Sequence, residues 1–139
     1  MIDRELIISK ANRIHHHLQQ IRRKRGADLA EFLASEDRQQ LVAFNIQLAV
    51  QNCTDIAAHI IAGQGWGVSG SINEMFYTLE EKGCLSHETT EKMVAAVGFR
   101  NLVVHEYGKI DNKRLFEIAS KDIDDLTAFL REIFKHFQI

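Results

Sequence analysis

The sequence predicts an all-α fold, an up-and-down bundle of four main helices with one or two short extra helices. Three observations favour this fold. The 139 residues include no proline, so no helix is forced to break by a missing backbone N–H. Apolar residues recur at steps of three and four, the spacing of one helical face. No segment shows the apolar–polar alternation of a half-buried strand, and the length predicts a single domain over residues 1–139.

The first helix is predicted over residues 4–25, followed by Gly26 as a stop. Its other faces and its last turn are basic, which suits the unsatisfied carbonyls of a helix end. Residues 1–26 carry seven basic and two acidic residues, a net charge of +5, so the remainder carries −7 to give the total of −2. The expected apolar stripe is Ile7, Ala11, Ile14, Leu18 and Ile21.

A long second helix is predicted over residues 36–62, after one or two helical turns at 28–34. Ser35 is its expected N-cap, because a serine hydroxyl can accept from the free N–H groups of the first turn. The glycine-rich segment 63–70 ends it. The side chains expected to face inward are Leu41, Phe44, Leu48, Ile56 and Ile60.

Three further helices complete the predicted bundle. Ser71 is expected to cap a short helix that closes at Gly83, and Ser86 to cap the next helix, with Met93, Val94 and Val97 in its core. The last helix is predicted over residues 113–137. Its apolar stripe is Leu115, Ile118, Ile123, Leu126, Phe129, Leu130, Ile133 and Phe137.

Composition excludes several classes of protein. A net charge of −2 excludes a histone-like chain that binds nucleic acid by bulk positive charge. Cys53 and Cys84 form no CxxC pair, which argues against a zinc ribbon or a disulfide framework and favours reduced thiols. We expect no signal peptide, no membrane-spanning segment and a cytoplasmic location, because the longest uncharged segment, residues 56–73, holds four glycines.

Several conspicuous features have a simpler structural interpretation. His15, His16 and His17 point about 100° apart on a helix and cannot converge on one metal ion, so we expect one half-buried and two solvated rings. The Gly63–Gly70 segment lacks the Lys-Ser/Thr ending of a phosphate loop and reads as an interhelical loop. Trp66 either packs on the bundle or anchors a partner, and packing is favoured.

Two charged features also carry alternatives. The basic run Arg22–Arg25 could contact RNA phosphates, although helix-end electrostatics explains it more simply. Asp55 and His59 stand four residues apart and are expected to form a polar pair on the second helix.

The segment Gly98-Phe-Arg-Asn-Leu-Val-Val-His-Glu-Tyr-Gly108 carries the chemical information. Arg100 is always charged and can hold a phosphate with two N–H groups. A histidine side chain can take up and release a proton in a reaction, so His105 is the candidate proton carrier. A base and a cation are the minimum for cleaving an RNA phosphodiester without metal, so the residue chemistry suggests this reaction.

Helical geometry limits how these residues cooperate. Arg100 and His105 would lie about 140° apart on a regular helix, whereas Asn101 and His105 would lie about 40° apart and Arg100 and Tyr107 within about 20°. One intact helix therefore does not aim Arg100 and His105 at one phosphate. Either the helix ends near Val104, or Arg100 wraps around it, or two chains pool their residues across a two-fold axis.

This segment resembles the signature of the HEPN superfamily, an Arg followed after four to six residues by His-x-Tyr, which Arg100-x4-His105-x-Tyr107 fits. The longer string Gly-Phe-Arg-Asn-x-x-Val-His-x-Tyr resembles the HepT branch, the toxins of two-gene MNT–HEPN toxin–antitoxin systems. The chain length, the long second helix with Asp55 and the Leu79-x-x-Lys-Gly83 string agree with that likeness.

The resemblance implies a HEPN-like bundle that acts as a homodimer and as a metal-independent endoribonuclease without a cofactor. It implies Arg100 and His105 as the catalytic residues, Asn101 as a supporting polar group, and attack by the RNA's own 2′-hydroxyl to leave a cyclic phosphate. It also implies a nucleotidyltransferase antitoxin of the MNT type, which transfers AMP from ATP onto Tyr107. On the helical estimate this AMP would lie beside Arg100.

Two other functions compete with this expectation. The chain could be a non-catalytic, substrate-binding subunit of a minimal nucleotidyltransferase, or a dimeric RNA-binding protein that uses the motif without cleavage. An intact Arg100–His105 pair counts against a purely structural subunit, which needs neither residue.

Overall fold

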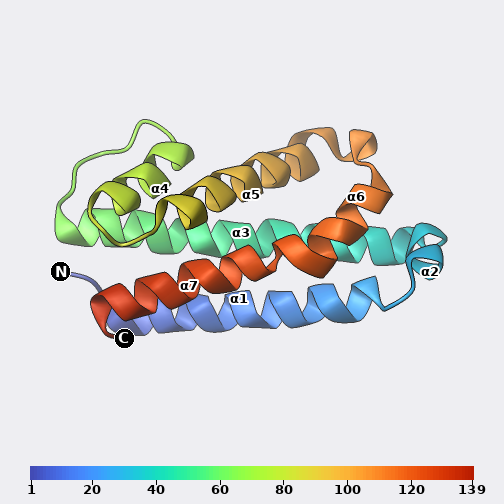
Figure 1. Cartoon of the computed structure of the whole chain (residues 1–139), viewed down its shortest axis with the longest axis horizontal. Helices are drawn as coiled ribbons and strands as arrows, with labels where there is room; N and C mark the ends of the chain where they lie inside the picture. The colour runs from blue at the N-terminus through green and yellow to red at the C-terminus, as the bar shows by residue number, and fades with distance from the viewer.

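The computed structural model describes residues 1–139 as helices joined by short loops (Figure 1). The four long helices alternate in direction along one axis (Figure 1), which confirms the predicted all-α, up-and-down bundle. In chain order the elements are α1 (Arg4–Arg25), α2 (Leu29–Leu33), α3 (Glu36–Gln64), α4 (Ile72–Glu81), α5 (His87–Glu106), the 3₁₀ turn η1 (Tyr107–Lys109), α6 (Asn112–Glu117), the π-helical turn η2 (Ile118–Asp122) and α7 (Asp124–Phe137).

Helix α1 begins and ends where the sequence predicts. Asp3 caps its first turn by accepting from the N–H of Leu6, and Gly26 ends it with a positive φ of 70° that favours glycine. All five residues of the predicted stripe are buried, none more than 3% exposed. The α1 prediction is therefore confirmed in both its bounds and its inward face.

Helix α3 also has the predicted start, and Gln64 extends it by two residues beyond the predicted end. The Ser35 hydroxyl accepts from the N–H of Arg38, as expected of an N-cap, and Gly65 ends the helix in the left-handed conformation. The amide of Gln39 donates to the carbonyls of Phe32 and Leu33, which ties the start of α3 to the end of α2.

The predicted inward face of α3 is partly wrong. Ile56 and Ile60 are buried, but Leu48 is only half-buried, and Leu41 and Phe44 are 40% and 54% exposed. A different stripe of α3, spaced by three and four residues, faces the core instead. The buried residues of this part of α3 include Val42, Ala43, Ile46, Ala49, Val50 and Cys53. Leu41 and Phe44 are left on a face that no other element covers.

The amino end of the chain packs against the far end of α3. The Met1 amino group donates to the carbonyl of Gly63, and the N–H of Asp3 donates to Nε2 of His59 at 2.8 Å. A Cβ atom at position 63 would lie 2.6 Å from the Met1 carbonyl oxygen, so this approach requires glycine. His59 therefore does not pair with Asp55, and the predicted polar pair on α3 is wrong.

The predicted last helix is interrupted by a π-helical turn, which divides it into α6 and α7. Nη1 of Arg25 donates to the carbonyl of Ala119 within this turn at 3.1 Å. Nη2 of Arg114 pairs with Asp122 at 3.1 Å across it. Single π-helical turns occur where a helix is redirected. Here Arg25 satisfies the carbonyl of Ala119 from outside the turn, and the Arg114–Asp122 ion pair spans the turn.

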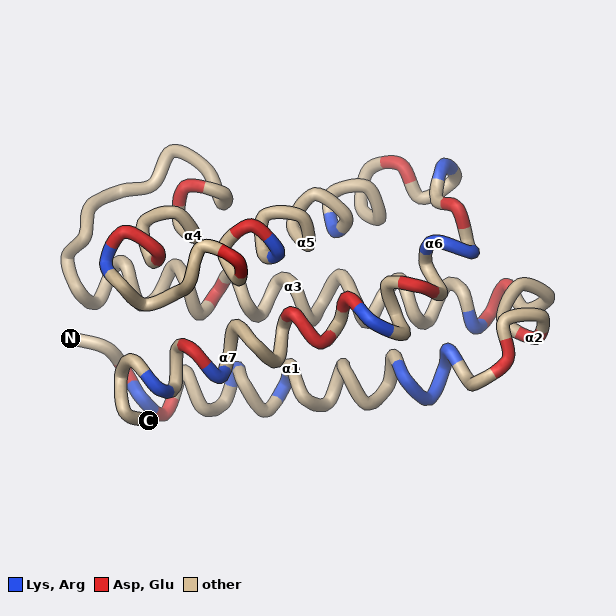
Figure 2. Tube along the Cα trace, viewed as in Figure 1, with Lys and Arg blue, Asp and Glu red and all other residues tan.

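Charge is distributed unevenly over the bundle. Basic residues gather at the carboxyl end of α1, and acidic residues are frequent along α4 and α7 (Figure 2). The two cysteines are free and buried, and burial raises the pKa of both thiols, that of Cys84 to about 11. None of the helices combines the length and the apolar character that crossing a bilayer requires.

Candidate active site

The Arg-x4-His segment occupies the end of α5 and the turn that follows. The helix continues through Val104 and His105 and ends at Glu106, whose φ of −140° and ψ of 41° leave the helical region. The alternative in which the helix ends near Val104 is therefore wrong. Arg100 and His105 sit on one regular helix, about 140° apart.

Arg100 lies on the side of α5 that faces α3. Its Nη2 donates to Oε1 of Gln51 at 3.1 Å, and its Nε is buried without a hydrogen-bond partner. No carboxylate of the chain pairs with this guanidinium, although a buried N–H without a partner costs about 1–3 kcal/mol. The charged guanidinium of Arg100 therefore has an N–H group that is free to bind an anion from outside the chain.

Gln51 is held in place by a polar network that crosses three helices. Its Nε2 donates to Oδ1 of Asp55 at 3.1 Å, and Nζ of Lys10 on α1 pairs with Oδ2 of Asp55 at 3.0 Å. The carboxylate binds the amide nitrogen, so the amide oxygen faces Arg100. The sequence reasoning missed Gln51, because nothing in its spacing marks it as polar support for α5.

Asn101 and His105 are exposed on a separate flank of α5 and form no hydrogen bonds within the chain. Lys92 of α5 pairs with Asp125 of α7 at 3.6 Å, which places α7 on the flank of Lys92. His105 lies about 140° around the helix from Lys92. Its imidazole is therefore free to meet a ligand on the side of the bundle away from α7.

Tyr107 lies at the corner between α2 and α3, where it borders the same space as Leu33, Glu36 and Gln39. Burial and, next, the charge of Glu36 raise the pKa of its phenol, so Glu36 is close to the ring. Glu106 leaves the helical region, so the helical estimate that puts Tyr107 on the face of Arg100 does not extend past Glu106. The shared face of Arg100 and Tyr107 stays a prediction.

An uncovered apolar face lies next to Arg100. It consists of Leu41, Phe44 and Leu48 on α3 and Val104 on α5, one turn beyond Arg100; Phe44 and Val104 are 54% and 43% exposed. Gln51 continues this face one turn beyond Leu48. We refer to these four apolar residues as the open face.

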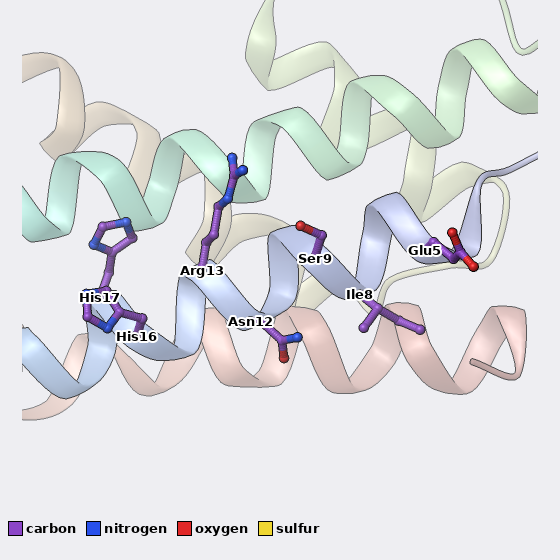
Figure 3. Close-up of a pocket in the computed structure, with 7 residues that line it drawn as sticks. All are labelled: Glu5, Ile8, Ser9, Asn12, Arg13, His16 and His17. Carbon is purple, nitrogen blue, oxygen red and sulfur yellow. The ribbon is translucent and has the colours of Figure 1, made fainter.

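The other sequence candidates lie apart from this site. His17 is half-buried and its Nδ1 lies 2.9 Å from Oδ1 of Asn45, while His15 and His16 are exposed, as predicted. A shallow groove of about 520 Å³ has walls from α1 alone, and its Arg13 and His17 point toward α3 while His16 points away (Figure 3). No three His, Cys, Asp or Glu residues are grouped as metal ligands.

The basic run and the glycine-rich loop have structural roles. Arg22 pairs with Asp124 at 3.6 Å, and Arg25 donates to the carbonyls of Gly26 and Ala119. Trp66 is half-buried against the core, with Nζ of Lys82 5.6 Å from the centre of its ring, which confirms packing over an exposed anchor.

Comparison with known proteins places this geometry in a family. The family model "Ribonuclease HepT-like" matches residues 14–133. The chain is 25% identical over 126 residues to the mRNA nuclease HepT of Shewanella oneidensis, covering 91% of this chain and 94% of that protein. It is 26% identical over 132 residues to the tRNA nuclease HepT of Aphanizomenon flos-aquae, covering 95% and 90%.

A solved structure shows the same fold. The tri-AMPylated Shewanella oneidensis HEPN toxin, solved in complex with its MNT antitoxin, superposes with a TM-score of 0.89 at 24% identity, covering 96% of this chain and 99% of that one. Because the family model spans most of the chain, from α1 to α7, the protein belongs to the HepT-like ribonuclease family.

Proposed function

We propose that this chain is a metal-independent endoribonuclease, the toxin of a type VII-like toxin–antitoxin pair, acting in the cytoplasm as one HEPN-like domain over residues 1–139. The observation that carries the proposal is the guanidinium of Arg100, charged, unpaired by any carboxylate and with a buried N–H left open. The exposed His105 and Asn101 near the same end of α5 and membership of the HepT-like family support it.

The proposed reaction uses the RNA as its own nucleophile. His105 takes the proton of the 2′-hydroxyl, whose oxygen bonds to the adjacent phosphorus while the bond to the 5′-oxygen breaks. Arg100 stabilises the charge that builds on the phosphoryl oxygens, and Asn101 supports the phosphate with its amide. A protonated histidine returns a proton to the leaving 5′-oxygen. The products are a 2′,3′-cyclic phosphate and a 5′-hydroxyl.

We propose that the active unit is a homodimer formed through the open face. A single chain separates Arg100 and His105 by about 140° around α5, so a two-fold axis next to α5 lets one chain's Arg100 work with the other chain's His105. Leu41, Phe44 and Val104 are large apolar residues that remain exposed in one chain and become buried in such a dimer.

We propose that a minimal nucleotidyltransferase of the MNT type neutralises the toxin by modifying Tyr107. The phenol oxygen attacks the α-phosphorus of ATP, a new O–P bond forms, and pyrophosphate leaves. A tyrosine phenol is protonated at neutral pH, and burial and Glu36 raise the pKa of Tyr107 further, so the transferring enzyme has to supply the base. Each attached AMP adds bulk and negative charge near the RNA site.

Cleavage of RNA by the purified, unmodified chain in EDTA tests the proposal. His105→Ala is the test variant and His16→Ala, another exposed histidine, is the control. We expect cyclic-phosphate ends from the wild type and from His16→Ala, and none from His105→Ala. Equal cleavage by all three would remove His105 from the mechanism. No cleavage by the unmodified wild type would favour the substrate-binding subunit of a nucleotidyltransferase instead.

The modification has its own test. Incubation with the cognate nucleotidyltransferase and ATP is expected to add the mass of AMP to the wild type and not to Tyr107→Phe. The same mass gain on Tyr107→Phe would place the site elsewhere.

A further inference from the structure

A shallow recess of about 380 Å³ opens beside Tyr107, at the corner where α2 meets α3. It lies at the end of the bundle where α5 ends and α2 meets α3 (Figure 1), and Tyr107 and Gly108 of η1 line it. Its walls include Leu33, Glu36, Gln39, Tyr107, Ile110 and Asn112.

The walls of this corner recess suit a flat ring with a polar edge. Leu33 is 45% exposed and the ring of Tyr107 is 38% exposed, so apolar and aromatic surface faces the recess without a partner from this chain. Glu36 and Asn112 supply a carboxylate and an amide. No lysine, arginine or histidine lines it, so the recess does not suit a phosphate.

We propose that the corner recess takes a nucleobase of the RNA substrate, next to the phosphate that is cleaved, with the base stacked on Tyr107 and its edge read by Glu36. This inference rests on the proposed ribonuclease function. Proteins that read single-stranded RNA commonly stack splayed bases on tyrosine and bond their Watson–Crick edges.

The chain positions Glu36 for this reading. Its charge contributes to the raised pKa of Tyr107, so the carboxylate and the phenol border the same space. Nε2 of Gln40 donates to Oε1 of Glu36 at 3.1 Å, which steadies the carboxylate and leaves a second lone pair on Oε1 and both on Oε2 open. Nε2 of Gln39 donates both of its hydrogens to carbonyls of α2, which fixes the position of Gln39 in the wall of the recess.

The chemistry of Glu36 predicts which base fits. A carboxylate accepts hydrogen bonds and donates none, so it favours a base with adjacent N–H donors on its Watson–Crick edge. Guanine offers N1–H and N2–H₂ side by side. Uracil places a carbonyl on each side of its single N–H, and both carbonyls repel the carboxylate. We expect guanine to be favoured and uracil to be disfavoured most.

The recess is placed to act together with the cleavage site. Tyr107 follows His105 by two residues, so a phosphate at His105 and a base on Tyr107 can belong to neighbouring nucleotides. An AMP group on the Tyr107 oxygen would also stand at the mouth of the recess. The proposed modification would then block base binding as well as phosphate binding.

Single-turnover cleavage of matched oligonucleotides tests the inference. The strands differ only at the positions flanking the cleaved bond, where all four bases are compared. We expect kcat/KM to favour guanine over uracil about tenfold or more at one position, since one bidentate contact discriminates by roughly that amount. Glu36→Gln is expected to flatten this preference, and Asp37→Asn, the neighbouring acid that does not line the recess, to keep it.

A binding measurement separates this inference from the nuclease proposal. The strand carries a 2′-deoxy sugar at the cleaved position, so it cannot react, and the methyl signals of Leu33 and Ile110 are followed by NMR. We expect a guanine strand to shift both signals and an abasic strand to shift neither. Suppose that RNA is cleaved without base preference, and that Glu36→Gln and Asp37→Asn show the same lack of preference. That result would overturn the base-binding role of the recess and leave the nuclease proposal standing. Methyl shifts without any cleavage would keep the recess and reject the nuclease, and neither effect would reject both.

Discussion

Nη2 of Arg100 and Oε1 of Gln51 lie 3.1 Å apart, and this contact joins α5 to α3 through a neutral acceptor. Asp55 orients the amide of Gln51 by accepting a hydrogen bond from its Nε2, and Lys10 of α1 pairs with the same carboxylate. The network orients the guanidinium without cancelling its charge, because the only carboxylate in it pairs with lysine. In the proposed reaction, a substrate phosphate would meet an arginine that is positioned and still fully charged.

Gln51→Glu tests this arrangement. A carboxylate at this position would pair with Arg100 and compete with the RNA phosphate, so we expect KM for RNA cleavage to rise about tenfold or more with the fold intact. Gln19→Glu adds the same charge on an exposed part of α1 and is expected to change KM little. An unchanged KM in Gln51→Glu would show that Arg100 does not bind the phosphate from this position.

Phe44→Asp tests the open face as the homodimer contact. Phe44 is 54% exposed, so its replacement costs one chain little stability but would bury a charge in the dimer. We expect a monomer by light scattering and loss of RNA cleavage. Val68→Asp places the same charge on a fully exposed loop residue and is expected to remain dimeric and active. A dimeric Phe44→Asp would move the interface to another face.

Two glycines in helices are expected to respond oppositely to alanine. A Cβ atom at Gly98 meets nothing within 4 Å, so Gly98→Ala is expected to raise the free energy of unfolding by about 0.5–1 kcal/mol. A Cβ atom at Gly63 would collide with Met1, so Gly63→Ala is expected to lower it instead. Urea unfolding measures both. Equal gains would show that the amino end moves aside freely.

The tyrosines predict a pH effect at alkaline pH. The phenol of Tyr107 has a raised pKa in the fold, caused by burial and then by Glu36, against an unfolded value of about 10. Its contribution to stability is therefore full below pH about 10 and is lost as the pH rises through the folded pKa. We expect Glu36→Gln to lower this pKa in an ultraviolet titration of tyrosinate.

The second tyrosine provides the matched control for that titration. Tyr77 donates to Glu91 at 3.2 Å, and its pKa is also raised, chiefly by burial and then by Glu91. Glu91→Gln is expected to move the Tyr77 transition and leave the Tyr107 transition in place, and Tyr107→Phe assigns the two. If Glu36→Gln leaves the pH of the Tyr107 transition unchanged, Glu36 does not share the corner recess with Tyr107.

The sequence was sufficient to predict the helices because their signals are local. Asp3, Ser35, Ser71 and Ser86 all cap as their residue types suggest, and Gly26 and Gly65 end their helices with positive φ. The inward face of α3 could not be read in the same way. Its most conspicuous apolar residues, Leu41 and Phe44, are the ones left exposed, because the bundle packs on the stripe that includes Val42, Ile46 and Val50.

The candidate site was predicted in its residues but not in its geometry. The motif spacing identifies Arg100, Asn101, His105 and Tyr107, and the roles of these residues stay a prediction. Gln51 and Glu36, which place two of them, come from a helix about fifty to seventy residues earlier, and no local pattern links them to α5. The turn at Glu106 also lies outside helical periodicity, so the sequence could not place Tyr107 beside the α2–α3 corner.

The buried N–H of Arg100 that has no partner affects which substitutions can inactivate such a protein. A chain that harms its own cell is under selection for disabling substitutions once its antidote is absent. Exchange of Arg100 for leucine or methionine would remove an uncompensated buried donor along with the charge, and we expect the folded chain to gain stability from it. Inactive variants selected in this way would then be well folded and abundant. They would differ from the active protein by one missing guanidinium, and their helical bundle would be intact.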